Sequence, residues 1–244
     1  MGTVTFDLWD TLIQEVPGGS LEVARIRMEK ISDILKARGR PHPMEEIGEA
    51  YAKTGSFLDL AWGKCRDMTV RDQVLFMLSC IEWRLPSKLG NEGFSEVEEA
   101  YAVSMLEHRP ILLPDAKGVL EEVRSMGLRL GLVSNTGRTP GSILRTVIKD
   151  QGILEYFDVT TFSDEVLVRK PAQAIFRTTL EGLRAPPRAS LHVGDDPRAD
   201  VDGAKDCGMM AVQVRTEKQH SNARADAHAQ RLKDVVGIVD SLRR

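Results

Sequence analysis

The chain has 244 residues, enough for one domain with a large core or for a core domain with a smaller insert. It has a formal net charge of −3, 42% hydrophobic residues and 28% charged residues, as in an ordinary soluble globular protein. It has no basic stretch suited to nucleic acid or an anionic membrane surface, so we expect neither partner. No run reaches the roughly 18 apolar residues that a membrane span requires.

The three cysteines, Cys65, Cys80 and Cys207, are too widely spaced for a disulfide framework or a CxxC metal site. We interpret them as buried thiols in a reducing compartment. The N-terminus leads directly into the apolar run Val4–Leu8, without the features of a signal peptide. We therefore expect a cytoplasmic protein, and the sequence does not indicate its oligomeric state.

In chain order, the run Val4–Leu8 is typical of a short buried strand. The segment that follows, up to about Glu107, has apolar residues at helical steps and no strand-like alternation. Trp62 and Trp83 are expected in the apolar core of this helical segment. Arg25 and Arg27 could reach an anionic substrate, but we expect them on a solvated face.

Beyond Pro110 the pattern alternates between strands and amphipathic helices. Strands are predicted at Leu128–Val133, Phe157–Phe162, Ser190–Val193 and Met209–Val214. Alternation of this kind predicts an α/β fold with a doubly wound, Rossmann-like parallel sheet. The last segment, from about Ala225, is predicted to be a charged amphipathic helix. We thus expect an α/β core domain from residues 1–15 and 108–244, and a helical domain from residues 16–107 inserted over its ligand-binding edge.

Polar residues follow four predicted strands, where all should meet at the same edge of the sheet. Clustered carboxylates repel one another, and a hard cation such as Mg²⁺ would relieve that repulsion. The same cation would neutralise a bound phosphate, which a carboxylate can attack. Hydroxyl and ammonium groups can stabilise the phosphate oxygens. The residues concerned are Asp7 and Asp10, Ser134 and Asn135, Arg169 and Lys170, and Asp195, Asp196 and Asp200.

The order and spacing of these motifs resemble the haloacid dehalogenase-like (HAD) hydrolase superfamily over nearly the full chain. The matching segments are Asp7-Leu8-Trp9-Asp10-Thr11-Leu12, Leu132-Val133-Ser134-Asn135, Lys170-Pro171 and Gly194-Asp195-Asp196 followed by Asp200. The resemblance implies that the helical segment is a mobile cap that closes over the site.

The resemblance also implies the role of each residue. Asp7 would be the nucleophile and a Mg²⁺ ligand, with Asp195 and the backbone carbonyl of Trp9 as further ligands. Asp200 would orient Lys170 or a metal-bound water, and Asp196 could assist as a ligand. Ser134, Asn135 and Lys170 would bind the substrate, a small phosphorylated metabolite, with Ser134 and Lys170 also serving in catalysis.

One position departs from the phosphatase pattern. Phosphatases of this family carry a second aspartate two residues after the nucleophile, as general acid and base, and Trp9 stands there instead. Asp10 stands where the family usually has glycine. Either the proton shuttle is lost or Asp10 replaces it, and a one-residue shift in extended chain, which turns a side chain to the opposite face, favours the loss.

Family dehalogenases also have an aromatic residue at the position of Trp9, so a metal-independent 2-haloacid dehalogenase is the main alternative. They typically replace the Gly-Asp of the last motif, whereas this chain keeps Gly194-Asp195. We therefore favour a Mg²⁺-dependent phosphate-ester hydrolase that forms an aspartyl-phosphate. The third hypothesis is a catalytically weak member of the family that binds a phosphorylated ligand. Lys64 could serve as the Schiff-base lysine of a phosphonate-cleaving relative, but we interpret it as a surface lysine.

Overall fold

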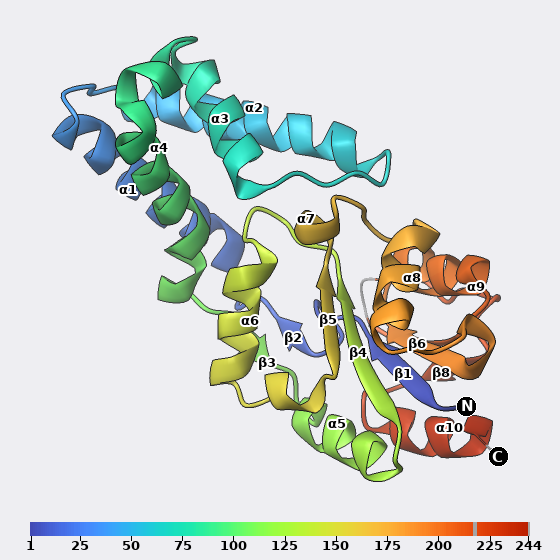
Figure 1. Ribbon diagram of the computed structural model, residues 1–244. Helices are drawn as coiled ribbons and strands as arrows, with labels where there is room; N and C mark the ends of the chain where they lie inside the picture. Colours follow the sequence, from blue (N-terminus) through green and yellow to red (C-terminus); the bar gives the residue numbers. More distant parts are fainter. Residues whose placement is uncertain (217–218, 244) are drawn as a thin grey trace.

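The computed structural model describes residues 1–216 and 219–243. Six strands form one parallel sheet in the order β5-β4-β1-β6-β7-β8, with β1 in its interior (Figure 1). The predicted doubly wound α/β fold is therefore confirmed. The strands are β1 (Thr3–Phe6), β4 (Arg129–Ser134), β5 (Val159–Phe162), β6 (Ser190–Gly194), β7 (Met210–Val214) and β8 (Ala227–Ala229).

The register of the three inner strands brings their carboxyl ends level. Phe6 in β1 lies opposite Leu132 in β4 and Val193 in β6. The amide of Asp7 donates a hydrogen bond to the carbonyl of Val193 at 2.9 Å. The residues that follow these strands therefore meet at one edge of the sheet, where open α/β sheets bind their ligands.

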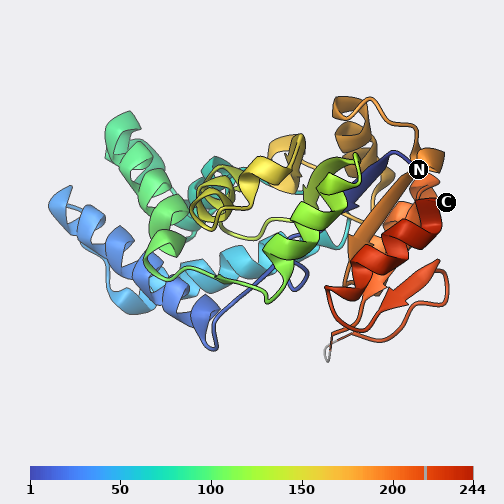
Figure 2. The same ribbon diagram turned by 90° about the horizontal axis from the view of Figure 1, so that it is seen from below.

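Helices cover both faces of the sheet (Figures 1 and 2). On one face, β1 and β4 pack against α5, α6 and α10 through a cluster that includes Phe6 and Leu132. On the other face, Val133 packs with Phe176 and Ala204 from α8 and α9. These helices are α5 (Ala116–Ser125), α6 (Gly141–Asp150), α7 (Ser163–Val166), α8 (Gln173–Gly182), α9 (Gly203–Cys207) and α10 (Asp234–Arg243). Short turns complete the connections: η1 (Ser104–Glu107), η2 (Leu154–Tyr156), η3 (Pro187–Ala189) and the π-helical η4 (Pro197–Asp202).

Residues 19–103, here called the helical insert, form four helices that stand to one side of the sheet (Figure 1). Their apolar faces pack in a cluster of their own, which includes Leu35, Met77 and Tyr101. The prediction that Trp83 belongs to this core is wrong, because its side chain is 81% exposed. The helices are α1 (Gly19–Ala37), α2 (Met44–Trp62), α3 (Val70–Ile81) and α4 (Leu85–Val103).

Two short strands at the base of the insert were not predicted. β2 (Ile13–Gln14) and β3 (Ile111–Leu112) pair antiparallel, so the chain leaves and re-enters the α/β part side by side. Strands of two residues are too short to show a hydrophobic period. The prediction of a helix from about Ala225 is also wrong, because β8 lies there and the helix begins only at Asp234. With three residues, β8 is likewise too short to show a hydrophobic period.

Of the three cysteines, Cys207 is buried, whereas Cys65 and Cys80 are only partly buried, and all three are free thiols. The prediction that all three cysteines are buried is therefore wrong for Cys65 and Cys80. No helix in residues 1–216 and 219–243 combines the length and apolar character that crossing a membrane requires.

A buried ion pair fastens the far end of the insert to the α/β part. The carboxylate of Asp67, which follows α2, accepts a hydrogen bond from Arg169 at 2.7 Å and from Thr136 at 3.2 Å. Its backbone amide donates to the carbonyl of Leu167 at 3.1 Å. The Asp67 side chain is fully buried and that of Arg169 is 12% exposed. The Asp67–Arg169 pair thus adds to the β2–β3 base in holding the insert against the α/β part.

We expect Asp67→Asn to destabilise the protein by about 3–5 kcal/mol, because Arg169 would keep a buried charge without its counter-ion. Asp59→Asn on the exposed surface of α2 is the matched control and should change stability by no more than about 0.5 kcal/mol. Urea-induced unfolding of both variants measures the difference. A loss in Asp67→Asn no larger than in the control would contradict this role for the pair.

Candidate active site

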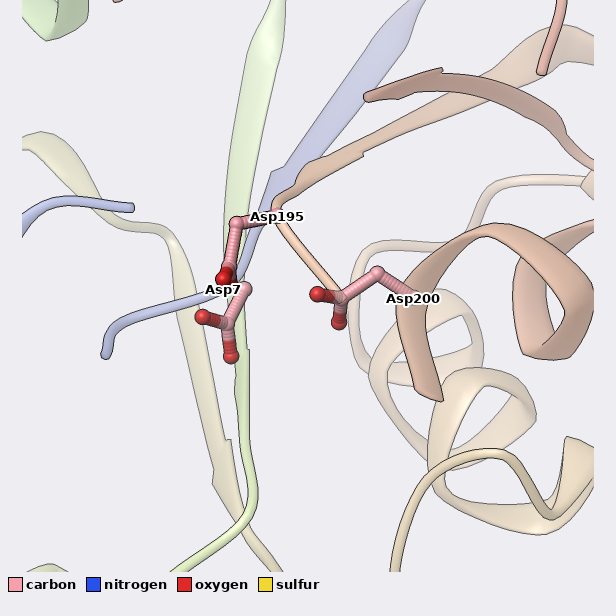
Figure 3. Close-up of side chains that lie close together, drawn as sticks. All are labelled: Asp7, Asp195 and Asp200. Carbon is pink, nitrogen blue, oxygen red and sulfur yellow. The ribbon is translucent and has the colours of Figure 1, made fainter. Parts of the chain in front are cut away.

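Three carboxylates gather at the carboxyl edge of the sheet (Figure 3). Asp7 follows β1, Asp195 follows β6, and Asp200 lies in η4. Each offers an oxygen within 4.8 Å of the other two, and all three residues are buried. The register of β1 and β6 places Asp7 beside Asp195, and the turn after β6 brings Asp200 back toward them.

The ammonium of Lys170 lies between two of these carboxylates. It donates hydrogen bonds to Oδ1 of Asp7, to Oδ1 of Asp200 at 2.7 Å and to the carbonyl of Val133 at 2.8 Å. Burial alone would lower the pKa of Lys170, but the charges of Asp200 and Asp7 raise it above its ordinary value. Lys170 is therefore a protonated, fully bonded cation.

Asp200 holds Lys170 in place and is itself held. Besides Lys170, it accepts hydrogen bonds from Nε2 of His192 at 3.1 Å and from the amide of Asp196 at 2.9 Å. Burial opposes its ionisation, yet Lys170 and His192 together bring the pKa of Asp200 below its ordinary value. A side chain at Gly194 would overlap the Asp200 carboxylate, so glycine is required there. These contacts fit the positioning role that the resemblance implies for Asp200.

Asp7 and Asp195 are in the opposite situation. Burial raises the pKa of Asp7 to about 7, in spite of the attraction of Lys170. Burial and the negative charges of Asp7, Asp200 and Asp10 raise the pKa of Asp195 to about 8. One lysine does not balance this group of carboxylates, and the remaining negative charge favours a cation beside Asp7 and Asp195.

The segment after β4 shapes the opposite wall. Ser134 is fully buried, and its hydroxyl donates to the carbonyl of Asn135 at 3.3 Å. The Asn135 side chain accepts from the amide of Lys170 at 2.8 Å and donates to the Lys170 carbonyl at 3.1 Å. Asn135 thus fixes the backbone of the lysine, a contact that the sequence did not indicate.

Trp9 and Asp10 point to different cavities. Trp9 lines the cavity between the insert and the sheet edge, whereas Asp10 lines a separate one together with Arg215 and Thr216. Asp10 has a φ of 54°, in the left-handed region that glycine occupies most readily. This conformation explains why glycine is usual here in the family. It also separates Asp10 from the position at which a shuttle aspartate would stand.

Asp196 does not face the other carboxylates. Its Oδ1 accepts the amides of Arg198 at 2.8 Å and Ala199 at 2.7 Å and caps η4. This is the ordinary N-cap interaction. The described contacts therefore give Asp196 a structural explanation that needs no metal.

A cavity of about 510 Å³ lies over the edge of the sheet. Its walls include Trp9, Asn135 and Arg169, the sequence neighbours of the site residues, together with Trp62 from the insert. Arg27 also lines it and is only 2% exposed, so its predicted place on a solvated face is wrong. Arg25 is exposed as predicted, and so is Lys64, which does not line this cavity.

Comparison with known proteins agrees with this geometry. A family model described as haloacid dehalogenase-like hydrolase matches residues 1–208. The chain belongs to this hydrolase family. Phosphoserine phosphatase of Thermus thermophilus is 35% identical over 228 residues, which cover 88% of each chain.

Solved structures share the fold of this HAD hydrolase. A 2-haloacid dehalogenase from Pseudomonas syringae pv. Tomato superposes with a TM-score of 0.74 over 99% of both chains, at 20% identity. A HAD phosphatase from Thermococcus onnurineus gives a TM-score of 0.62 over 98% of both chains, at 25% identity. Both reaction types of the family are thus found on closely similar folds.

Two residues of the site region escaped prediction for different reasons. Asp67 carried no signal, because its partners Thr136 and Arg169 are distant in sequence. His192 lies buried in β6, and its Nδ1 is 2.8 Å from the hydroxyl of Thr5. The contact between His192 and Asp200 depends on the path of the turn between β6 and η4, which residue patterns do not predict.

The raised pKa values of Asp7 and Asp195 predict that the metal-free protein loses stability as the pH rises from about 4 to 8. Both carboxyls would return to a pKa of about 4 on unfolding. Between that value and the folded pKa the folded state binds more protons, so its stability falls as pH rises, by about 1.4 kcal/mol for each unit of pKa shift.

Urea unfolding in EDTA across this range measures the effect, with Asp195→Asn as the comparison. The variant lacks one of the two titrating groups, so its stability should decline less steeply with pH. Equal slopes in the variant and the wild type would show that these carboxyls do not carry the raised pKa values.

Proposed function

We propose that this HAD hydrolase is a Mg²⁺-dependent phosphatase that cleaves a phosphate ester of a small metabolite through an aspartyl-phosphate on Asp7. One observation carries the proposal: Asp195 is buried beside Asp7, and burial together with the negative charges of its neighbours raises its pKa to about 8, in spite of the attraction of Lys170. A site that retains this carboxylate is suited to a divalent cation. The similarity to a phosphoserine phosphatase also supports phosphate-ester chemistry.

The residues present fit Mg²⁺, which prefers oxygen ligands. Asp7, Asp195 and the backbone carbonyl of Trp9 would hold it, and Asp200 would stay outside the ligand set because its oxygens are already bonded. When bound, the cation would neutralise the phosphate charge and lower the pKa values of the two carboxyls.

The chain's own residues would carry the reaction. A carboxylate oxygen of Asp7 attacks phosphorus, the ester P–O bond breaks, and the alcohol leaves with a proton from solvent. Water then cleaves the acyl-phosphate, which releases phosphate and restores Asp7. Lys170 keeps the Asp7 carboxylate oriented, and on substrate binding it would exchange one of its three hydrogen bonds for one to a phosphate oxygen. The hydroxyl of Ser134 would also bind the phosphate oxygens, with Asn135 fixing the lysine backbone.

We also propose that residues 16–107 act as a cap domain on the core formed by residues 1–15 and 108–244. The pairing of β2 with β3 gives the two connections a shared base, around which the insert could rotate. The Asp67–Arg169 pair would hold the closed position, in which the cavity between the insert and the sheet edge would exclude bulk water.

Trp9 is the observation that favours the second candidate, a metal-independent 2-haloacid dehalogenase. It lines the cavity where phosphatases of the family place their proton-shuttling aspartate. In that reaction the Asp7 carboxylate would attack carbon and expel halide. The raised pKa values of Asp7 and Asp195 argue against it, because a site without a cation would keep part of its nucleophile protonated near neutral pH.

We expect hydrolysis of p-nitrophenyl phosphate in Mg²⁺ and its loss in EDTA. Asp7→Asn should lower kcat by at least about 10³-fold, since it removes the nucleophile. Phosphate release measures both, and halide release from 2-chloropropionate in EDTA is the control. Metal-independent halide release without phosphatase activity would establish the dehalogenase instead.

Asp10→Asn should change kcat by less than about threefold, because Asp10 lines a cavity away from Trp9. Asparagine tolerates the left-handed backbone of this position, so the variant removes the charge without strain. Rates on phosphate esters with good and poor leaving groups provide the test. A loss of about 10²-fold or more, confined to poor leaving groups, would assign the general acid to Asp10.

A further inference from the structure

The cavity between the insert and the sheet edge has room for more than a phosphate group. Its volume is about 510 Å³, and it is lined by Trp9, Asn135 and Arg169, which lie within two residues of Asp7, Ser134 and Lys170 in the sequence. Its outer walls come from the insert, through Arg27 and Tyr51, and from Arg138. The part of a substrate that does not react would therefore lie against these outer residues.

Arg27 and Arg138 are held there entirely by neutral groups. Arg27 donates to the carbonyl of Tyr101 at 2.7 Å, to the hydroxyl of Tyr51 at 2.9 Å and to Thr139 at 3.1 Å. Arg138 donates to the hydroxyl of Tyr101 at 2.9 Å and to the carbonyl of Tyr51 at 2.8 Å. Its guanidinium stacks 3.7 Å from the centre of the Tyr51 ring.

Neither guanidinium forms an ion pair with a carboxylate of residues 1–216 or 219–243. By contrast, Arg169 pairs with Asp67, and Arg38 and Arg25 pair with glutamates. Removing a guanidinium from water without a counter-ion is costly. Arg27 is 2% exposed and Arg138 is partly buried, and a negatively charged ligand in the cavity would supply the counter-ion that both lack.

The chain also makes room for Arg138 at a cost. Gly55 lies in the middle of α2, where glycine destabilises a helix. A methyl group there would lie 2.8 Å from an Nη atom of Arg138. Glu15 lines the same cavity, but it is exposed at the rim, so the buried part of the wall stays positively charged.

We propose that Arg27 and Arg138 bind a carboxylate of the substrate, so that the substrate class is phosphorylated short organic acids. This inference rests on the proposed phosphatase function and extends it. A guanidinium has five N–H donors. Arg27 uses three of these donors and Arg138 uses two in hydrogen bonds within the protein. The remaining donors suit the two oxygens of a planar carboxylate.

Two matched pairs of substrates test the proposal. O-Phosphoserine differs from O-phosphoethanolamine only by a carboxylate, and 3-phosphoglycerate carries a carboxylate where glycerol 3-phosphate has an alcohol. We expect kcat/KM to be at least about 10-fold higher for the carboxylate member of each pair, as for one charged hydrogen-bonded contact. Equal values within both pairs, or a higher value for a compound with a second phosphate such as fructose 1,6-bisphosphate, would overturn it.

Variants locate the effect. Arg138→Gln should lower the ratio of kcat/KM within each pair by roughly 10-fold or more. Gly55→Ala, which displaces the Arg138 side chain, should act in the same direction. Arg25→Gln, on the exposed face of α1, is the matched control and should leave the ratio unchanged. Circular dichroism verifies folding, and unchanged ratios in folded Arg138→Gln would overturn the proposal.

A binding measurement separates this inference from the proposed reaction. Trp9 and Trp62 line the cavity, so their fluorescence reports its occupation. Glycolate should give a saturable change in EDTA that glycolamide does not give and that Arg138→Gln weakens. If no phosphate ester is hydrolysed but this binding is found, the carboxylate site stands and the phosphatase proposal fails. Phosphatase activity without carboxylate preference or glycolate binding would support the phosphatase proposal and overturn the carboxylate site.

Discussion

The ammonium of Lys170 is the contact on which the arrangement of this site depends. It joins Asp7 after β1, Asp200 in η4 and the carbonyl of Val133 in β4. These segments are far apart in sequence, and the parallel register of β1, β4 and β6 makes their meeting possible. Because Lys170 satisfies both partners, the third carboxylate, Asp195, is left with repulsion from its neighbours. The cation that we propose beside Asp7 and Asp195 would balance this remaining negative charge.

The sequence was sufficient to predict the sheet and the convergence of Asp7, Lys170 and Asp195, because both follow from local patterns. Apolar runs define strands, and parallel strands bring their carboxyl ends to one edge. Contacts between distant side chains had no such signal. The burial of Arg27 depends on Tyr101 and Thr139, which helix periodicity cannot place beside it.

Very short elements were also beyond prediction. Two- and three-residue strands such as β2, β3 and β8 form because neighbouring backbone groups are available, and not because of their own residues. The exposed Trp83 is a related case, since an apolar residue in a helical segment is usually expected to pack inward. The roles of the site residues and the two domain boundaries stay predictions.

The arginines around the cavity differ in their partners, and this difference indicates two roles, holding the insert and binding an anion. Arg169 forms an ion pair with the buried carboxylate of Asp67, and this pair holds the insert against the α/β part. Arg27 and Arg138 have hydroxyl, carbonyl and ring partners, which orient a guanidinium without neutralising it. The first arrangement stabilises the protein with an empty cavity, whereas the second becomes favourable only with an anion present. In the mechanism that we propose, closure of the insert and recognition of the ligand would be coupled, because Arg27 belongs to the insert and Arg138 to the segment that follows β4.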